Sequence, residues 1–233
     1  AKYLGSPVIS SDSRQFYKEL CIGTAPPTPQ QLEEVQHYFI HSRSITEDYT
    51  SGKFELEALD LISELFKTHS CLLMVGGSGL YIDAVCRGID AIPGTDSELR
   101  AELTQRLEEE GLHVLQRELK DLDLFTYNEI DINNPQRVIR ALEVCIISGE
   151  RYSDLKQVKA KKRAFNIIKI GLNRDRDELY KRINLRVDKM LENGLLEEAR
   201  ALYPQRRLNA LKTVGYKELF DYFDGAISLE KAI

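Results

Sequence analysis

Residues Val8–Tyr17, with the sequence VISSDSRQFY, place an acid and a base close together where an apolar run ends. Asp12 and Arg14 stand among three serines, directly after what reads as a buried strand. In an open parallel sheet, ligands bind beyond the carboxyl ends of the strands, so Asp12 is expected where it could meet a ligand. An Asp after a strand is equally suited to capping a helix, so the residue types alone leave both roles open.

A second candidate motif, GGSGLY at Gly76–Tyr81, follows the apolar run CLLMVGG at Cys71–Gly77. In an open parallel sheet, ligands bind beyond the carboxyl ends of the strands, which is where both motifs are expected to lie. Glycines there let the backbone approach a ligand closely, and the Ser78 hydroxyl at the start of a helix is suited to an anion. Glycines at such a turn serve strand–helix packing equally well, so this motif alone does not decide the role.

The elements that must position these motifs are few. Strands are predicted at the run ending in Ser10, at Cys71–Gly77, and at Phe165–Leu172, FNIIKIGL. Helical sequence lies beside the first two strands, which predicts βα units and a parallel sheet. After the third strand, Leu179 begins an apolar stripe at helical spacing that we interpret as core, ended by Gly194; its other members are Ile183, Val187 and Leu191.

The middle of the chain, from about Pro93 to Lys162, contains no convincing strand. One helix is predicted after an N-cap at Asp96 or Ser97, and another begins at Pro135 and stops at Gly149. Strands, then helices, then a strand again indicate an α/β core with an all-helical insertion. We therefore expect a core over residues 1–92 and 164–233 and an insertion over 93–163 that moves as one helical unit.

Composition restricts the function classes. The chain has 37 acidic and 32 basic residues, a net charge of −5, which argues against non-specific coating of nucleic acid. The basic run KQVKAKKR at 156–163 is either a local nucleic-acid surface or a solvated loop.

Four scattered cysteines without a C-x-x-C pair argue against a zinc site or disulfide framework and favour a cytoplasmic setting. No apolar run approaches the roughly 18 residues of a membrane span, so no membrane partner is expected.

Five segments, in order, resemble those of tRNA dimethylallyltransferases, also called tRNA isopentenyltransferases. They are ISSDSRQFYKELCIGTAPP, VGGSGLYIDAV, NNPQRVIRALEV, IGLNRDRDELYKRINLRVDKML and TVGYKEL. The resemblance covers essentially the whole chain. It implies a P-loop kinase-like parallel sheet and transfer of a dimethylallyl group from dimethylallyl diphosphate to N6 of the adenine adjacent to the anticodon. It further implies the tRNA anticodon stem-loop as partner and Mg²⁺ as cofactor, and we expect a monomer.

The sequence departs from that family in one respect. The resemblance implies a Walker A loop, G-x-x-x-x-G-K-[ST], ahead of AKYLG at residues 1–5, and the printed sequence contains no such loop. Its amides and lysine cradle a diphosphate. AKYLG reads as the last turn of a helix and SLEKAI, at the other end, as the first turns of another, so a piece of a longer protein is expected.

The resemblance assigns roles to individual residues. It makes Asp12 the general base, and Arg176 the arginine that neutralises the diphosphate together with Gly77 and Ser78. Cations and Mg²⁺ would stabilise the charge that grows on that leaving group. The family's tRNA contacts map to Asp12, Ser13, Arg14, Gln15, Ser78, Arg100, Gln136, Arg137, Val138, Ile139, Arg140, Lys212, Thr213, Val214, Gly215, Tyr216 and Lys217.

Three alternatives stay open at this point. A P-loop nucleotide kinase would share the core and the strand-end Asp, but would not need the Q-R-x-x-R helix at 136–140. An adenylate isopentenyltransferase would prenylate a free nucleotide and would not need an extensive tRNA surface. An RNA-binding fragment without catalysis is the non-enzymatic alternative. For Arg137 and Arg140 the structural alternative is a pair with Glu143, one helical turn along.

Overall fold

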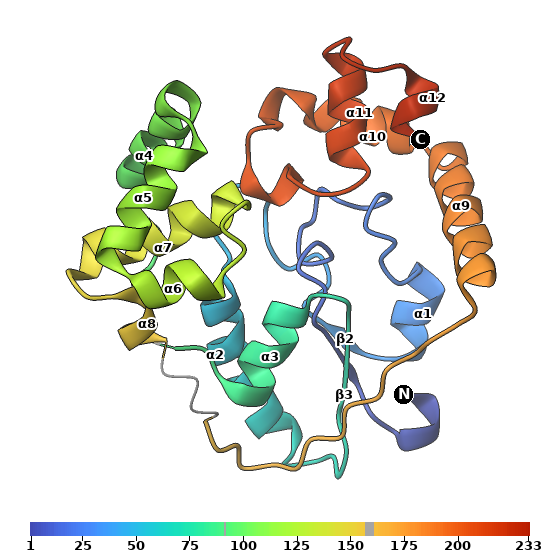
Figure 1. Ribbon diagram of the computed structural model, residues 1–233. Coiled ribbons are helices and arrows are strands. Elements are labelled where there is room, and N and C mark those ends of the chain that lie inside the picture. Colours follow the sequence, from blue (N-terminus) through green and yellow to red (C-terminus); the bar gives the residue numbers. More distant parts are fainter. Residues whose placement is uncertain (91, 157–160) are drawn as a thin grey trace. The chain divides into compact units, whose positions relative to one another are not determined.

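The computed structural model describes residues 1–90, 92–156 and 161–233 (Figure 1). Positions 157–160 of the basic run at 156–163 lie outside these ranges. The chain divides into two compact units, one made of residues 1–86 and 163–233 and the other of residues 87–162. The sequence predicted an insertion over 93–163. The two units are described separately below as the core unit and the helical unit.

The core unit contains a parallel sheet of three short strands in the order β2-β1-β3. These are β1 (Val8–Ser10), β2 (His37–Tyr38) and β3 (Leu73–Val75). The two strands predicted before the candidate motifs are therefore confirmed, and β2 was not predicted. Because β1 and β3 pair in register, with Ser10 opposite Val75, their carboxyl ends lie next to each other.

A first apolar cluster packs around the central strand. Ile9, Phe16 and Phe54 have no exposed surface, and the Phe16 and Phe54 rings stack with centroids 5.3 Å apart. Phe54 comes from α2 (Ser51–Leu65), which begins at an N-cap where the Thr50 side chain accepts from Lys53 N. The remaining elements of this part of the chain are a 3-10 turn at Lys2–Leu4, α1 (Pro29–Glu34) and α3 (Gly79–Arg87).

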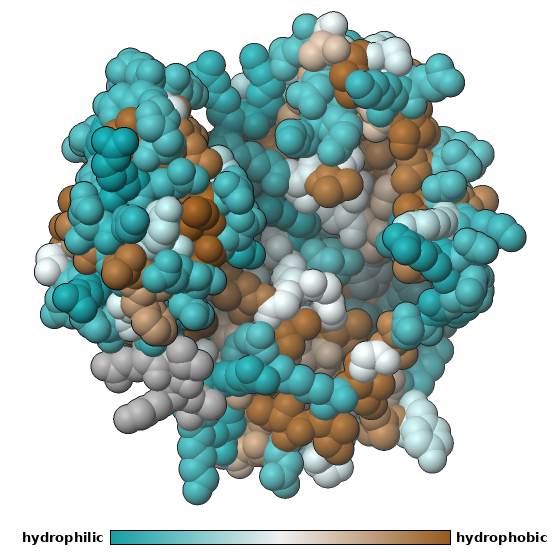
Figure 2. Space-filling view, in the orientation of Figure 1, coloured by the Kyte–Doolittle hydropathy of each residue, from teal (hydrophilic) through white to brown (hydrophobic). Residues whose placement is uncertain are grey.

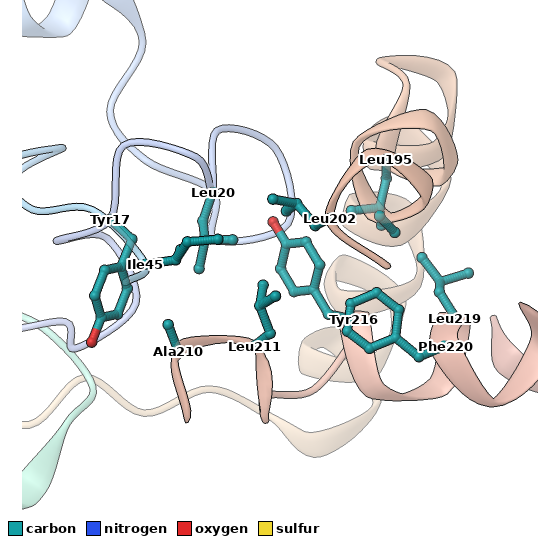
Figure 3. Close-up of a cluster of buried hydrophobic side chains, with 11 residues drawn as sticks. Tyr17, Leu20, Ile45, Leu195, Leu202, Ala210, Leu211, Tyr216, Leu219 and Phe220 are labelled. Atoms are coloured by element: carbon teal, nitrogen blue, oxygen red, sulfur yellow. The ribbon is translucent and has the colours of Figure 1, made fainter. Parts of the chain in front are cut away.

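A second cluster joins the loop after β1 to the C-terminal helices (Figure 3). Leu20 and Leu211 are fully buried in it, and so is the Tyr216 ring. The helices involved are α10 (Leu195–Leu202), α11 (Tyr216–Phe223) and α12 (Leu229–Ala232), with short 3-10 turns at Tyr203–Gln205 and Asn209–Leu211. The C-terminal helices thus support the loop that follows Asp12.

The predicted third strand is wrong. Residues 165–172 form no strand, and Ile168, Ile170 and Leu172 are 87%, 81% and 97% exposed. β-branched residues favour extended backbone, but a strand also needs a neighbour for its N–H and C=O groups, and none lies beside this segment within the described residues. Figure 2 shows hydrophobic surface along the lower edge of the molecule, where the segment runs in Figure 1.

The stripe on α9 (Arg176–Glu192) is amphipathic as predicted, but it is not core. No residue of α9 is buried, and Leu179 and Ile183 are each 43% exposed. The packing that the helix does make is near its C-terminal end, where Met190 and Leu191 lie against the second cluster. The pattern predicted a helix correctly and overestimated how much of it is covered.

The helical unit contains no strand among its described residues, in agreement with the sequence. Its helices are α4 (Ser97–Glu110), α5 (Leu112–Leu122), α6 (Leu124–Glu129), α7 (Pro135–Ser148) and α8 (Tyr152–Leu155). The predicted N-cap at Asp96 is confirmed, since its side chain accepts from the amides of Glu98 and Leu99. Leu103, Leu115 and Leu142 are fully buried in a core of its own.

None of the helices described is both long enough and apolar enough to cross a membrane.

Candidate active site

The two motifs predicted separately from the sequence meet at the carboxyl ends of β1 and β3. The Ser13 amide donates to Ser78 Oγ at 2.9 Å, and that hydroxyl donates to Ser13 Oγ at 3.0 Å. The residues are 65 positions apart in the chain, and the parallel pairing of their strands brings them together. This edge of the sheet therefore presents two hydroxyls and a carboxylate within one small region.

Gly76 and Gly77 do different jobs at this edge. A Cβ at Gly76 would lie 2.5 Å from the Ser11 carbonyl carbon and 2.7 Å from the Asp12 amide nitrogen, so only glycine lets the two strand ends approach. A Cβ at Gly77 would meet nothing within 4 Å. The first glycine is thus needed for packing, and the second leaves open space beside the Ser78 hydroxyl.

Asp12 is half-buried and does not cap a helix. Its Oδ1 accepts from the Arg14 amide at 2.9 Å, which closes a local turn, and its own amide donates to Ser10 Oγ at 3.4 Å. In the part of the chain that the structure describes, the second carboxylate oxygen has no hydrogen-bond partner. The next hydroxyl, Ser11 Oγ, is buried and also has no partner there. The open oxygen of the half-buried Asp12 is available to a ligand, whereas Ser11 has no exposed surface and faces Gly76.

Arg14 and Gln15 hold the neighbouring loops in place. Arg14 Nη1 donates to the carbonyl oxygens of Asn209 and Ala210, each at 3.2 Å. Gln15 Nε2 donates to the carbonyls of Thr24 and Ala25 at 3.2 and 3.1 Å, while its Oε1 accepts from Ser10 Oγ at 3.2 Å. These side chains, predicted as tRNA contacts, are thus also the ties between the strand end and the loops around it.

The Glu198 carboxylate was missed by the sequence analysis. It accepts from three consecutive amides, those of Cys21 at 2.9 Å, Ile22 at 3.0 Å and Gly23 at 3.2 Å, and from the Tyr216 hydroxyl. Burial and this hydrogen bond raise the pKa of the Tyr216 phenol. A Cβ on Gly23 would lie 2.6 Å from the Tyr216 ring. The loop backbone at Gly23 therefore packs directly against that ring. We call this arrangement the Glu198 clasp.

No local pattern in the sequence points to the Glu198 clasp. Two acids in the first turn of a helix, as at Glu197 and Glu198, are common because they complement the helix dipole. Gly23 and Tyr216 contact each other in the structure, but they lie far apart in the sequence. Nothing in the sequence alone indicates that they are neighbours.

The clasp corrects the prediction for Tyr216. Its side chain has no exposed surface and therefore cannot contact RNA. Within the same segment, Lys212, Val214 and Lys217 are exposed, and Thr213 and Gly215 are partly so. Gly215 has a φ of 91°, which favours glycine, and its amide donates to Glu218 Oε2 at 2.7 Å.

Arg176 lies at the start of α9 and is exposed. Its Nε donates to the Tyr180 hydroxyl at 2.9 Å, and its guanidinium lies 5.5 Å from the centre of that ring. Within the described part of the chain, no hydrogen bond or ion pair joins Arg176 to Asp12 or Ser78. The structure therefore does not bring it into contact with the strand-end cluster.

In the helical unit, two of the predicted arginines converge on a buried acid. Glu143 is fully buried, and its Oε2 accepts from Arg140 at 2.8 Å and from Arg100 at 3.0 Å. Glu143 Oε1 accepts from the Asp96 amide at 3.1 Å, and Arg140 also donates to the Pro93 carbonyl at 2.6 Å. A buried carboxylate is tolerated only when it is paired and hydrogen-bonded, so these arginines have a structural role.

The other residues predicted on α7 divide by face. Gln136 and Arg137 are exposed, and Gln136 Oε1 accepts from Arg100 at 3.4 Å. Val138 and Ile139 have no exposed surface and pack in the core of the helical unit, so their side chains cannot contact RNA, contrary to the prediction. The family motif predicted tRNA contacts for all of residues 136–140, whereas only one face of a helix is exposed to solvent.

Comparison with known proteins now identifies the family. The family model described as IPP transferase matches residues 15–233. The chain belongs to the IPP transferase family. A tRNA dimethylallyltransferase 2 of Azobacteroides pseudotrichonymphae is 54% identical over the whole chain, which covers 76% of that protein. A tRNA dimethylallyltransferase 1 of Bacteroides fragilis is 50% identical, and the chain covers 77% of it.

Solved structures of the IPP transferase family support the fold. The full-length tRNA isopentenylpyrophosphate transferase of Bacillus halodurans is similar at a TM-score of 0.67 and 36% identity, with all of this chain and 73% of that one covered. A eukaryotic dimethylallyltransferase acting on tRNA, 24% identical, has a TM-score of 0.73 over all of this chain and 60% of its own, which shows a shared fold. The predicted class, a P-loop-like α/β core with a helical unit, is confirmed.

Proposed function

We propose that this protein is a tRNA dimethylallyltransferase that transfers a dimethylallyl group from dimethylallyl diphosphate to N6 of the adenine adjacent to the anticodon. Homologues of that name, about half identical to it along its whole length, support the activity. We assign the reaction to this edge of the sheet because Asp12, Ser13 and Ser78 lie at the adjacent ends of β1 and β3.

Asp12 acts as the general base. The N6 amine of adenine is a weak nucleophile because its lone pair is delocalised into the ring. As the bond from N6 to the allylic carbon forms and the bond from that carbon to the diphosphate oxygen breaks, a proton leaves N6. The open oxygen of Asp12 accepts it, while the other oxygen stays bonded to the Arg14 amide and keeps the carboxylate oriented. The diphosphate departs with the bonding electrons.

The leaving diphosphate needs donors and positive charge. The open backbone at Gly77 leaves room for the diphosphate, the Ser78 hydroxyl can donate to it after turning away from Ser13 Oγ, and Arg176 supplies charge. Arg176 must swing away from Tyr180 to do so, which an exposed side chain at the start of a helix can do.

Mg²⁺ is part of this proposal. Within the described residues, no group of three His, Cys, Asp or Glu side chains is placed to hold a metal ion. Mg²⁺ often uses one carboxylate or hydroxyl together with substrate phosphates and water, and the oxygens of Asp12, Ser13 and Ser78 fit that use. When bound, the ion would neutralise charge on the diphosphate.

The substrate RNA must present its adenine outside the base stack, and nucleotides of an anticodon loop are accessible enough for this. The exposed polar residues among those predicted to contact tRNA are suited to bind the RNA backbone: Gln136, Arg137, Lys212 and Lys217.

The free thiols of Cys21 and Cys71 are exposed, which fits a reducing, cytoplasmic setting. The monomeric state stays a prediction.

The test is a transfer assay with the full natural protein. Dimethylallyl diphosphate labelled in the prenyl group is offered with an anticodon stem-loop containing the adenine, with the same RNA carrying guanine there, or with AMP. We expect label in the first RNA alone. Transfer to AMP at a comparable rate would instead establish an adenylate isopentenyltransferase.

A further inference from the structure

The backbone of Ser78 is not held in place by its immediate neighbours. Ser78 lies between Gly77 and Gly79, and a Cβ at either glycine would meet nothing within 4 Å. Glycine permits a wide range of backbone conformations, so this short segment does not by itself fix the direction of the Ser78 hydroxyl. Leu80, the next residue, is 64% exposed. The first side chain of α3 that reaches the core is that of Tyr81, three residues after Ser78.

Tyr81 attaches the first turn of α3 to the core unit. Its backbone amide donates to the Ser78 carbonyl at 2.9 Å, so the two residues move together. Its ring packs against the fully buried rings of Phe16 and Phe54, with centroids 5.5 and 5.4 Å away. Its hydroxyl donates to the Tyr49 carbonyl at 3.1 Å. Because burial raises the pKa of Tyr81 to about 12, the phenol keeps the proton that this hydrogen bond needs at neutral and mildly alkaline pH.

The Tyr49 carbonyl is a fixed acceptor, because the Tyr49 side chain is packed and hydrogen-bonded. Tyr49 is 6% exposed, and its hydroxyl donates to Glu57 Oε2 at 2.9 Å. The Arg43 guanidinium lies 4.7 Å from the centre of the Tyr49 ring and pairs with the same Glu57 carboxylate. We call Arg43, Tyr49 and Glu57 the Tyr49 anchor.

The Tyr49 anchor also holds the loop that follows β1. The Arg43 amide donates to the Phe16 carbonyl at 2.9 Å, and the Arg43 carbonyl accepts from the Lys18 amide at 2.8 Å. The Tyr49 and Phe16 rings meet edge to face, with centroids 5.2 Å apart. Both motifs of the candidate site are therefore attached to the same group of residues, the first through Arg43 and the second through Tyr81.

We propose that Tyr81 is a positioning residue for the transfer reaction, and that its hydrogen bond to the Tyr49 carbonyl fixes where Ser78 lies relative to Asp12. This inference rests on the proposed function, in which the Ser78 hydroxyl donates to the diphosphate. A donor stabilises a leaving group best when it is aimed in advance at the place where charge develops, so a small displacement of Ser78 slows the reaction. Tyr81 acts without touching either substrate.

Hydrogen exchange tests the positioning without any need for activity. Tyr81→Phe removes the hydroxyl and keeps the ring in its aromatic cluster. Because the Ser13 amide donates to Ser78 Oγ at 2.9 Å, its exchange with deuterium reports on where Ser78 lies. We expect the Ser13 amide to exchange about tenfold faster in the variant, as measured by NMR. The Ser11 amide, which donates to the Val75 carbonyl at 2.8 Å, is the internal control. Unchanged exchange at Ser13, or equal acceleration at Ser11, overturns the proposal.

Turnover tests whether this displacement matters for the chemistry. In the full natural protein, we expect Tyr81→Phe to lower kcat about tenfold and to leave the KM for RNA unchanged. Tyr49→Phe is the matched control, because it removes a hydrogen-bonded hydroxyl from the same aromatic cluster and keeps the carbonyl that Tyr81 uses. Tyr49→Phe should leave kcat within about twofold of the unaltered enzyme. An equal fall in kcat in both variants, or no fall in either, overturns the proposal.

A double-variant cycle shows whether Tyr81 acts through Ser78. In the Ser78→Ala background, Tyr81→Phe should lower kcat by less than about twofold, because no hydroxyl is left to position. The same fall in kcat in both backgrounds overturns the proposal. Absence of prenyl transfer by the unaltered protein would instead reject the proposed function, and exchange of the Ser13 amide would still decide whether Tyr81 positions Ser78.

Discussion

One carboxylate oxygen of Asp12 accepts a hydrogen bond from the Arg14 amide, and the other has no hydrogen-bond partner among the described residues. The committed oxygen holds the Arg14 amide and so fixes the direction of the second. Orientation of this kind removes freedom that a base on a mobile side chain would have to lose in the transition state. The neighbouring Ser13 and Ser78 hydroxyls are fixed by each other.

Replacing Asp12 by Asn separates the turn from the chemistry. Asn still offers an oxygen to the Arg14 amide but cannot act as the base, so the fold and RNA affinity should be retained. Turnover should fall by about 10²- to 10⁴-fold for both Asp12→Asn and Asp12→Ala. Single-turnover transfer to RNA, beside RNA binding measured by filter retention, tests this. Turnover of Asp12→Asn within twofold of the unaltered enzyme would reduce Asp12 to a structural turn.

The adjacent glycines offer a matched pair. Gly76→Ala forces a methyl group against the backbone of Ser11 and Asp12, and overpacking of this kind costs about 1–3 kcal/mol. Gly77→Ala enters open space and should leave stability nearly unchanged while weakening dimethylallyl diphosphate binding. Urea denaturation and a donor titration measure the two effects. Equal loss of stability in both variants would contradict the division of roles.

At the scale of elements, the strand end is held from the C-terminal side. The Glu198 clasp joins α10 and α11 to the loop at 21–23, and Arg14 joins the same strand end to the 3-10 turn at Asn209–Leu211. Both connections involve segments that contribute to the buried cluster of Figure 3, among them Ala210 and Tyr216. Elements separated by almost the whole sequence thus position one short loop.

Glu198→Gln tests that positioning. The amide side chain keeps a single acceptor oxygen and presents a donor group to backbone N–H groups, so the loop should loosen without loss of the core. We expect kcat to fall about tenfold, which corresponds to about 1.4 kcal/mol, with the KM for dimethylallyl diphosphate unchanged. Glu198→Asp, which keeps the charge, should recover part of the rate. Glu197→Gln, at the exposed neighbouring position, serves as the control, and an equal effect there would argue against the clasp.

In the helical unit, Arg137 and Arg140 should separate RNA contact from structure. Arg137 is exposed, whereas Arg140 helps to neutralise the buried Glu143. Arg137→Ala should lower the salt slope of RNA binding by about one without changing the melting temperature. Arg140→Ala should lower the free energy of unfolding by about 2 kcal/mol, because it removes a charge-assisted hydrogen bond from a buried acid. Calorimetry and binding at several salt concentrations distinguish the two, and identical behaviour would refute the assignment.

At the scale of the whole molecule, the chain consists of two units with separate cores, and the helical unit begins and ends in connections to the core unit at residues 86–87 and 162–163. Two crossings allow a unit to move as one body. The motion itself stays a prediction.

Energy transfer between dyes tests that motion. One dye is attached at Cys71 in the core unit and the other at a cysteine introduced at the exposed Glu109 in α4, with Cys21→Ser removing the competing exposed thiol. We expect a broad distribution of transfer efficiency that narrows when the anticodon stem-loop binds. A single narrow distribution, identical with and without RNA, would show that the units do not move relative to each other.

The sequence predicted the site best where a local motif follows a strand, because the sheet then determines where that motif lies. The meeting of Ser13 and Ser78 was predictable, because parallel strands that end in motifs place those motifs side by side. The strand at 165–172 was not correctly predicted, since apolar extended sequence does not reveal whether a partner strand is present. Glu198 could not be found because its three amides lie 175 to 177 positions away. Tyr216 was misassigned because a family motif names residues without separating those that touch a ligand from those that support it.

The uncovered segment at 165–172 bears on how this chain behaves in a crowded solution. It combines three isoleucines with a single charge, that of Lys169, which is itself paired with Asp83 at 2.9 Å. Short β-prone stretches with low charge are templates for cross-β assembly when their backbone is free to pair. A second copy of the chain could supply the missing partner for the N–H and C=O groups of this segment. We therefore expect the isolated chain to self-associate through this segment when it is concentrated, and light scattering at increasing concentration would detect it.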